Sequence, residues 1–240
     1  MERKNAWLSY GESDEKEMEK LTKDYRAFLD AGKTERECVT ELVREAEANG
    51  YVSLEAKQAA GEKIQPGDKV YAVGMKKIMA LFHVGQEPLE KGMNILGAHI
   101  DSPRLDVKQN PLYEDTDLAY LDTHYYGGVK KYQWVALPLA IHGVIAKKDG
   151  SVVNVTIGED ENDPIVYITD LLIHLAGKQL QKKAAEVIEG ENLDILIGSR
   201  PLSESTDEKK KEGVKRPSWP NPRHSKILFQ TCSHFESRDR

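Results

Sequence analysis

Cysteine is scarce in this 240-residue sequence, which has Cys38 in a helical pattern and Cys232 in a polar stretch. Two cysteines cannot form a disulfide framework, so we expect a reducing, cytoplasmic compartment. Long apolar runs are missing as well, because the longest, residues 134–146, is interrupted by Pro138 and His142. That run is shorter than the roughly 20 apolar residues that a membrane-spanning helix needs. With no apolar segment at its start, the sequence predicts neither a membrane protein nor a secreted one.

A positive charge excess of the kind that nucleic acids attract is also absent. The chain has 34 Lys and Arg against 40 Asp and Glu, a formal net charge of −6 at pH 7. It therefore lacks a sequence-wide positive field. No His-Glu-x-x-His, Cys-x-x-Cys or Gly-rich phosphate loop occurs. These absences argue against a nucleic-acid partner and against a nucleotide enzyme.

Apolar residues are frequent enough for a folded core. Hydrophobic residues make up 39% of the chain, and 10 Tyr, 4 Phe and 3 Trp are among them. Disordered chains lack such a composition. At this length the chain can form one large domain or two smaller ones.

The first fifty residues have the apolar spacing of two helices. A period of three to four positions predicts one helix over residues 15–29 and a second that begins at Thr34. Thr34 and Glu37 match a capping box, and Gly50 provides the stop.

Strands are predicted next, at residues 69–73, 77–82 and 93–98. The last of these is apolar without alternation, which is typical of a strand buried on both faces. Helices before buried strands favour a layered α/β arrangement for this part.

From about residue 106 the pattern changes to a β-rich unit, with strands predicted at residues 134–146, 151–157 and 165–168. Asp149 and Gly150 suit a two-residue type I′ hairpin turn. A helix over residues 169–176, capped by Thr169 or Asp170, should follow. Residues 203–240 have few apolar side chains and three prolines, so we expect a flexible tail.

The first candidate site is formed by His99 and Asp101, directly after the predicted buried strand. Side chains two positions apart on an extended backbone point to one face. A neutral imidazole is a good zinc ligand, and a nearby carboxylate can fix its tautomer and orientation. The alternative from the residues alone is an ordinary hydrogen-bonded pair.

Two further stretches carry weaker signals. Gly127 and Gly128 indicate either a hairpin or bulge, or a close approach of the main chain to another chain or a ligand. His174 lies among leucines in the predicted helix, where a histidine is usually a boundary residue with a local hydrogen bond.

Taken together, several runs resemble the aspartyl aminopeptidases and their bacterial relatives of the aminopeptidase I type. The runs are GAHIDSPRLD (97–106), PLYE (111–114), THYYGGVKKYQW (123–134), PLAIHGV (138–144), TDLLIHLA (169–176) and LIGSRP (196–201). The resemblance covers roughly the first 200 residues.

The resemblance implies a zinc-dependent exopeptidase that removes N-terminal residues from peptides. Its fold would be α/β, with residues 1–105 as the N-terminal part of a peptidase domain. Residues 106–202 would form an inserted β-rich dimerisation domain, and residues 203–240 a divergent tail. Dimers of such enzymes build larger, often dodecameric, homo-oligomers.

The same resemblance implies the site residues. His99 would be a zinc ligand, and Asp101 the catalytic carboxylate that orients it. His174 matches the histidine that the inserted domain presents to an active site, that of the partner subunit, as a metal or substrate contact. Zinc-bound water, with a pKa lowered toward about 7, would attack the peptide carbonyl.

One departure from the family pattern is clear. The family's peptidase domain resumes after the insert with a Glu-Glu pair, further acidic ligands and a distal histidine, and this sequence has no adjacent Glu-Glu or Asp-Asp. We therefore expect a truncated or frameshifted family member with little or no activity alone. The alternative function is a non-catalytic dimerising or binding protein that keeps the inserted domain.

Overall fold

The computed structural model describes residues 5–199. The chain divides into two compact units, Met1–Ser102 and Pro103–Arg240, and each is described by itself. The expectation for residues 203–240 lies outside the described residues.

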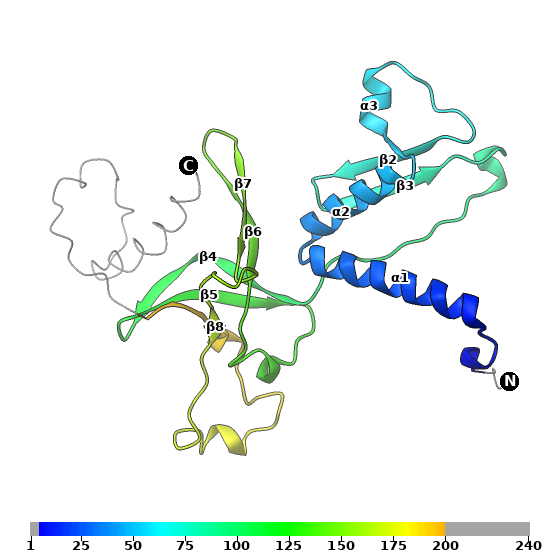
Figure 1. The fold of residues 1–240 in the computed structure, drawn as a ribbon. Helices are drawn as coiled ribbons and strands as arrows, with labels where there is room; N and C mark the ends of the chain where they lie inside the picture. Colours follow the sequence, from blue (N-terminus) through cyan, green and yellow to red (C-terminus); the bar gives the residue numbers. More distant parts are fainter. Residues whose placement is uncertain (1–4, 200–240) are drawn as a thin grey trace. The chain divides into compact units, whose positions relative to one another are not determined.

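The first unit contains three helices and a small sheet (Figure 1). The helices are α1 (Glu12–Ala31), α2 (Glu35–Ala48) and α3 (Leu54–Ala59), and short 3₁₀ helices lie at Ala6–Leu8 and Leu89–Lys91. The strands are β1 (Val52–Ser53), β2 (Lys69–Gly74) and β3 (Ile78–His83), in the order β1-β2-β3. β1 is parallel to β2, and β2 is antiparallel to β3.

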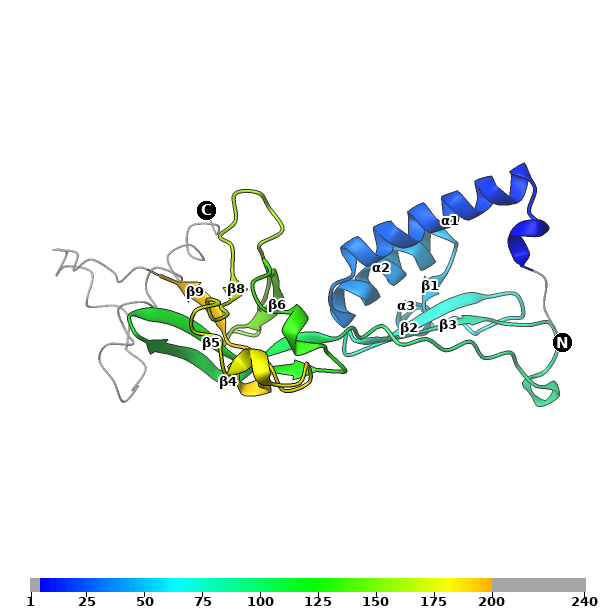
Figure 2. The same cartoon turned by 90° about the horizontal axis from the view of Figure 1, so that it is seen from below.

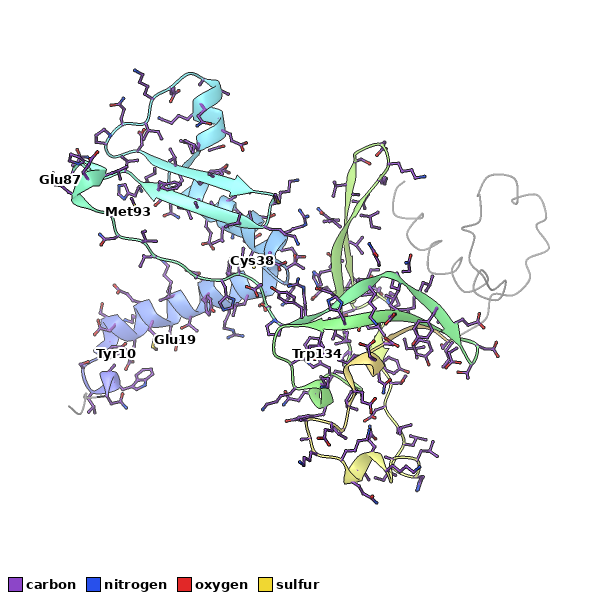
Figure 3. All side chains as sticks on the ribbon, turned by 180° about the vertical axis from the view of Figure 1, so that it is seen from behind. Tyr10, Glu19, Cys38, Glu87, Met93 and Trp134 are labelled. Atoms are coloured by element: carbon purple, nitrogen blue, oxygen red, sulfur yellow. The ribbon has the colours of Figure 1, made fainter. Side chains whose placement is uncertain are left out.

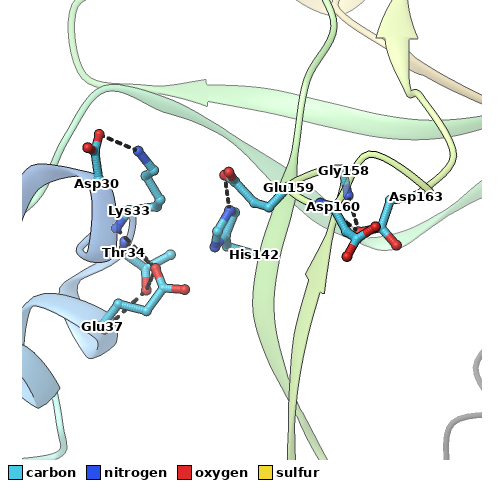
Figure 4. Close-up of polar contacts among 9 residues, drawn as sticks. All are labelled: Asp30, Lys33, Thr34, Glu37, His142, Gly158, Glu159, Asp160 and Asp163. Atoms are coloured by element: carbon cyan, nitrogen blue, oxygen red, sulfur yellow. Dashed lines mark hydrogen bonds and ion pairs between the residues drawn. The ribbon is translucent and has the colours of Figure 1, made fainter. Parts of the chain in front are cut away.

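The two helices predicted from apolar spacing are confirmed, and so are β2 and β3. Thr34 is the N-cap of α2, where its Oγ1 accepts from the Glu37 amide at 3.4 Å and Glu37 Oε2 accepts from the Thr34 amide at 2.8 Å (Figure 4). Gly50, after the helix, has φ +81°, a conformation that glycine adopts without strain.

The core of the first unit lies where α2 packs on the sheet. Its buried apolar residues are Cys38, Val39, Ala46, Val70 and Tyr71. The Tyr71 hydroxyl donates to Glu47 Oε1 at 2.7 Å and so ties β2 to the end of α2. The pKa of Tyr71 is raised, mainly because this hydrogen bond keeps the phenol protonated.

The prediction of a buried strand at residues 93–98 is wrong for the described chain. These residues belong to no helix or strand and are all exposed, with Leu96 at 99%. The sequence pattern identified an apolar segment, but burial needs neighbouring strands or helices to cover it. Residues 5–199 provide none for this segment.

The second unit is built mainly of strands. They are β4 (Arg104–Asp115), β5 (Leu118–Tyr126), β6 (Ile141–Ala146), β7 (Val152–Ile157), β8 (Tyr167–Ile168) and β9 (Ile195–Gly198). Four of them form an antiparallel sheet in the order β4-β5-β9-β8, while β6 and β7 form a separate hairpin (Figures 1 and 2).

The core of this unit gathers around β8 and β9. Its buried cluster is Val166, Ile168, Ile188, Leu193 and Ile195, with Leu193 at 0% exposure. Trp134 and Leu139 pack against that cluster from the stretch before β6, and Figure 3 labels Trp134. The unit therefore has its own hydrophobic centre, which an independently folding domain requires.

The first two predicted β-rich segments are both found, with corrections. Of residues 134–146, only the last six form a strand, because Pro138 has no amide to donate and the stretch before β6 makes only isolated bridges. The turn between β6 and β7 is not type I′. Only Gly150 has positive φ, and Lys147 and Ser151 close a longer loop by the Lys147 N to Ser151 O bond of 2.8 Å.

A type I′ turn does occur, between β4 and β5, where Thr116 and Asp117 both have positive φ. Threonine seldom adopts that conformation, so this turn could not be predicted from the residue types.

The predicted helix over residues 169–176 is wrong. These residues form only a turn at 173–175, within which the Leu175 amide donates to the Leu172 carbonyl at 2.8 Å. Leu171, Leu172 and Leu175 are more than half exposed. Among the described residues nothing packs on that apolar face, and short helices are marginal without such packing.

The mixed α/β class is thus confirmed. None of the helices in residues 5–199 is both long and apolar enough to cross a membrane.

Candidate functional site

His99 and Asp101 contact each other, which is the ordinary hydrogen-bonded pair that the residues alone left open beside a metal site. His99 Nδ1 lies 2.9 Å from the main-chain oxygen of Asp101 and 3.3 Å from its carboxylate Oδ1. The side chain of His99 is 83% exposed and that of Asp101 41% exposed. When Nδ1 carries the proton it donates to Asp101, and Nε2 then has its lone pair available for a metal ion.

The segment before Asp101 is fixed to α2 through Cys38. The buried Cys38 thiol donates to the Ile100 carbonyl at 3.7 Å and to the Gly32 carbonyl at 3.5 Å. Burial raises the pKa of this thiol, and the carboxylates of Glu37 and Glu35 raise it further. Cys38 therefore stays protonated at neutral pH, and its thiol donates a hydrogen bond to the Ile100 carbonyl.

The residues present fit part of a zinc site. His99 can supply one ligand and Asp101 its orienting carboxylate, whereas a tetrahedral site needs four ligands. Within residues 5–199 no group of three or more His, Cys, Asp or Glu could hold a metal ion together. The described part of the chain therefore does not bring together the ligands of a complete zinc site.

His174 belongs to the second unit, in the turn at residues 173–175, and is exposed. Asp170 holds the ends of this segment together, since its Oδ1 accepts from the Leu171 amide and from Gln179 Nε2, both at 2.8 Å. The turn presents His174 to solvent beside Leu172 and Leu175, which are 71% and 69% exposed.

Gly127 follows β5 and is not a hairpin turn. It has φ +77°, and a Cβ atom there would lie in ordinary van der Waals contact with Pro103, 3.6 Å from its Cα. Gly128 has open space around it. The two tyrosines before these glycines make cation–π contacts. Arg104 Cζ lies 4.3 Å from the ring centre of Tyr126, and Lys131 Nζ lies 5.6 Å from that of Tyr125.

The sequence analysis missed two polar clusters of the second unit. In the first, Lys108 Nζ lies 2.8 Å from both Asp122 Oδ1 and Glu191 Oε2, and these hydrogen bonds raise the pKa of Lys108. Lys108 and Asp122 lie on β4 and β5, two paired strands that the sequence analysis did not predict, so no signal in the sequence indicated this cluster.

The second cluster is centred on Asp194. Tyr113 donates its hydroxyl to Asp194 Oδ2 at 2.6 Å, and the Thr123 amide donates to Oδ1 at 3.3 Å. Burial, and then the hydrogen bond to Asp194, raise the pKa of Tyr113. Tyr113 and Asp194 are 81 positions apart, so no sequence spacing indicated the pair.

Known proteins match most of this chain. The sequence model of the aminopeptidase I zinc metalloproteases (M18) matches residues 28–233. That match runs past residue 202, into the tail that we expected to lie outside the resemblance. A probable M18 family aminopeptidase 1 from Clostridium acetobutylicum is 59% identical over 209 residues, and one from Thermotoga maritima is 44% identical over 214.

Solved structures agree in fold. The crystal structure of the M18 aminopeptidase from Thermotoga maritima matches 98% of this chain with a TM-score of 0.79 and 40% identity. That of aminopeptidase I from Clostridium acetobutylicum matches 98% with a TM-score of 0.76 and 50% identity.

In all four comparisons this chain spans about half the length of its relative. It covers 45% of both the Clostridium and the Thermotoga sequences, and 47% and 48% of the two solved chains. The family match itself extends over most of the 240 residues and includes both candidate segments, around His99 and around His174. The chain belongs to the aminopeptidase I zinc metalloprotease (M18) family.

Proposed function

We propose that this chain is part of a zinc-dependent aminopeptidase that hydrolyses N-terminal residues from peptides, with His99 as a zinc ligand. One observation supports it above all: Asp101 engages Nδ1 of an exposed His99 and leaves Nε2 for a metal. When bound, zinc would polarise the peptide carbonyl and lower the pKa of water.

In this proposal, the residues of this chain would hold the zinc ion and orient the His99 ligand. Asp101 would orient the imidazole of His99 through two oxygens and favour the tautomer that has its proton on Nδ1. The hydrogen bond from Cys38 to Ile100 fixes the main chain one residue away from both His99 and Asp101. His174 would contact metal or substrate at the active site of a partner subunit, and its exposure on a short turn is compatible with that role.

The same proposal includes assembly of this protein into a homo-oligomer in the cytoplasm. One solved structure with this fold is described as the Saccharomyces cerevisiae mApe1 dodecamer, but at 18% identity it shows the fold alone. The apolar side chains around His174 offer a surface that a second subunit could cover.

The remaining ligands and the general base would come from the part of the M18 length that this chain does not match. The test mixes the 240-residue chain with a polypeptide made of the unmatched part of the Clostridium acetobutylicum relative. We expect hydrolysis of an aminoacyl p-nitroanilide by the mixture and little or none by the chain alone. Chelation should abolish the activity.

Two variants sharpen the test. Asp101→Asn should lower the zinc affinity of the mixture by about 10- to 100-fold, since it removes the oriented carboxylate. His99→Gln should remove a ligand and most of the activity, whereas His83→Gln, on the exposed end of β3, should leave both unchanged. Chelator-sensitive hydrolysis by the chain alone that His99→Gln abolishes would contradict the expected inactivity. A mixture that binds zinc equally well in all variants would contradict the role of His99.

A dimerising role without catalysis is the second candidate, and the β6–β7 hairpin favours it. Val144, Ile145 and Val152 on this hairpin are 38%, 48% and 55% exposed, although the unit has a complete core. Light scattering of the zinc-free chain tests this candidate. A stable dimer of the chain, together with no hydrolysis by the mixture, would support it.

A further inference from the structure

The segment at residues 93–102, which contains the candidate zinc ligand, is joined to the helices of the first unit by one side chain. The Cys38 thiol of α2 donates to the Ile100 carbonyl at 3.7 Å, and Figure 3 labels Cys38 on this helix. Among residues 5–199, no other hydrogen bond or ion pair joins this segment to the rest of the unit. The segment belongs to no helix or strand, so regular backbone pairing does not orient it either.

The position of Cys38 is itself set by the start of α2. Its side chain is buried, at 5% exposure, and its amide donates to the carbonyl of the N-cap Thr34 at 2.9 Å. The thiol sulfur also lies 3.5 Å from the Gly32 carbonyl oxygen. The single thiol proton therefore lies between two carbonyl oxygens, one before the helix and one in the segment of the candidate site.

Gly32 leaves the space that the sulfur occupies. A Cβ atom on Gly32 would lie 2.8 Å from Cys38 Sγ and 3.2 Å from the Phe28 carbonyl oxygen, which is closer than van der Waals contact allows for the sulfur. The φ of Gly32 is −103°, so its backbone conformation does not by itself require glycine. The connection between α1 and α2 is thus shaped around the thiol.

The hydrogen bond to Ile100 acts on the peptide unit that leads to Asp101. The Ile100 carbonyl and the Asp101 amide share one rigid plane, so fixing the carbonyl limits the orientation of Asp101. Asp101 in turn faces Nδ1 of His99 with its main-chain oxygen at 2.9 Å and its Oδ1 at 3.3 Å.

We infer that Cys38 is a positioning residue of the candidate zinc site, which acts through the Ile100–Asp101 peptide to keep the proton of His99 on Nδ1. The inference rests on the proposed function, because the role requires Nε2 of His99 to be a metal ligand.

The test measures the tautomer of His99 in the zinc-free 240-residue chain. Long-range ¹H–¹⁵N NMR of ¹⁵N-histidine-labelled protein at about pH 8, where imidazole side chains are mostly uncharged, distinguishes the two forms. The His99 signals are assigned by their loss in His99→Gln. We expect the Nδ1–H form to predominate in the unaltered chain. Cys38→Ala should lower the ratio of Nδ1–H to Nε2–H by about two- to fivefold, the effect of losing one weak S–H···O hydrogen bond.

Two further variants separate positioning from the stability of the helix. Gly32→Ala keeps the thiol but puts a methyl group where the sulfur lies, so it should lower the ratio as Cys38→Ala does. Val39→Ala is the matched control, because it removes buried methyl groups from the same helix and leaves the thiol in place. Val39→Ala should lower the thermal unfolding midpoint without changing the tautomer ratio.

Zinc provides the second readout. The chain is mixed with the unmatched part of the Clostridium acetobutylicum relative, and the zinc affinity of the mixture is measured by titration calorimetry. The affinity should fall in Cys38→Ala and Gly32→Ala in proportion to the fraction of His99 in the Nδ1–H form, because only that form presents an unprotonated Nε2.

An unchanged tautomer ratio in Cys38→Ala and Gly32→Ala overturns the inference, even if the mixture hydrolyses peptides. An equal fall of the ratio in Val39→Ala also overturns it, since the effect would then come from loosening of the helix. A mixture of unaltered polypeptides that neither binds zinc nor hydrolyses substrate contradicts the proposed function, and with it the role of Cys38 at a zinc site. The NMR comparison would still show whether Cys38 orients His99.

Discussion

At the scale of single residues, the second unit depends on polar side chains that meet across long sequence distances. Tyr113 on β4 stacks on Tyr120 of β5, with ring centres 5.3 Å apart, and only Tyr113 has a hydroxyl bonded to Asp194 among the described residues. The two tyrosines therefore share packing and differ in one hydrogen bond.

Replacing Tyr113 should show how much the hydrogen bond to Asp194 contributes to the free energy of unfolding. We expect Tyr113→Phe to lower the free energy of unfolding by about 1–2 kcal/mol, because Asp194 loses a donor in a half-buried site. Tyr120→Phe, the matched control, should cost less than about 0.5 kcal/mol. Urea denaturation followed by circular dichroism measures both, and equal losses would show that ring packing, not the hydrogen bond, is responsible.

The same pair predicts a dependence on alkaline pH. The pKa of Tyr113 is raised above its ordinary value of about 10, so the folded state holds the phenol proton more tightly than the unfolded state. The contribution of the protonated Tyr113 to stability is complete below about pH 10 and is lost as the pH rises further. The loss of stability between pH 8 and pH 11 should be smaller in Tyr113→Phe. An identical loss in both proteins would contradict the assignment.

At the scale of elements, the β6–β7 hairpin depends on the glycine at its end. Gly158 has φ +96°, and a Cβ atom there would lie 2.9 Å from the Leu139 carbonyl oxygen and 3.1 Å from Ala140 Cα. Its amide donates to Asp163 at 2.9 Å (Figure 4). Near the same end, His142 Nε2 lies 3.0 Å from Glu159 Oε1.

An alanine should disturb this end of the hairpin. We expect Gly158→Ala to cost about 1–3 kcal/mol, because both the positive φ and the main-chain contacts oppose a Cβ. Gly143→Ala in β6 meets open space and should change stability by less than about 0.5 kcal/mol. Thermal unfolding of the two variants gives the comparison, and similar midpoints would refute it.

At the scale of the whole molecule, the segment that ends the first unit is an exposed stretch of main chain outside any helix or strand. Residues 93–99 are exposed and belong to no element, whereas β2 contains buried Val70 and Tyr71. Proteases need an extended, unpaired backbone, which such a segment provides without unfolding.

Brief subtilisin digestion should therefore cut within residues 93–102 well before it cuts β2 or β3. Mass spectrometry of the early fragments locates the cuts. Early cuts within Lys69–Gly74 instead would show that the first unit opens before the segment is attacked.

The sequence by itself determined what depends on neighbours within a few positions. The capping box of α2, the strands β2 and β3, the β6–β7 pair and the contact of His99 with Asp101 all follow from spacing, because the groups involved lie within one helix turn, one strand or one hairpin. The family resemblance, carried by short runs of residues, was equally local in origin.

Only the tertiary structure decided which apolar and polar groups find partners far along the chain. Residues 93–98 and 169–176 have apolar patterns that predict buried elements, yet both are largely exposed, with only Ala176 buried, because burial depends on segments that residues 5–199 do not bring to them. Conversely, Asp194 carried no signal until the sheet placed it against Tyr113 and Thr123. A pattern fixes which face is apolar, while long-range packing decides whether that face is covered.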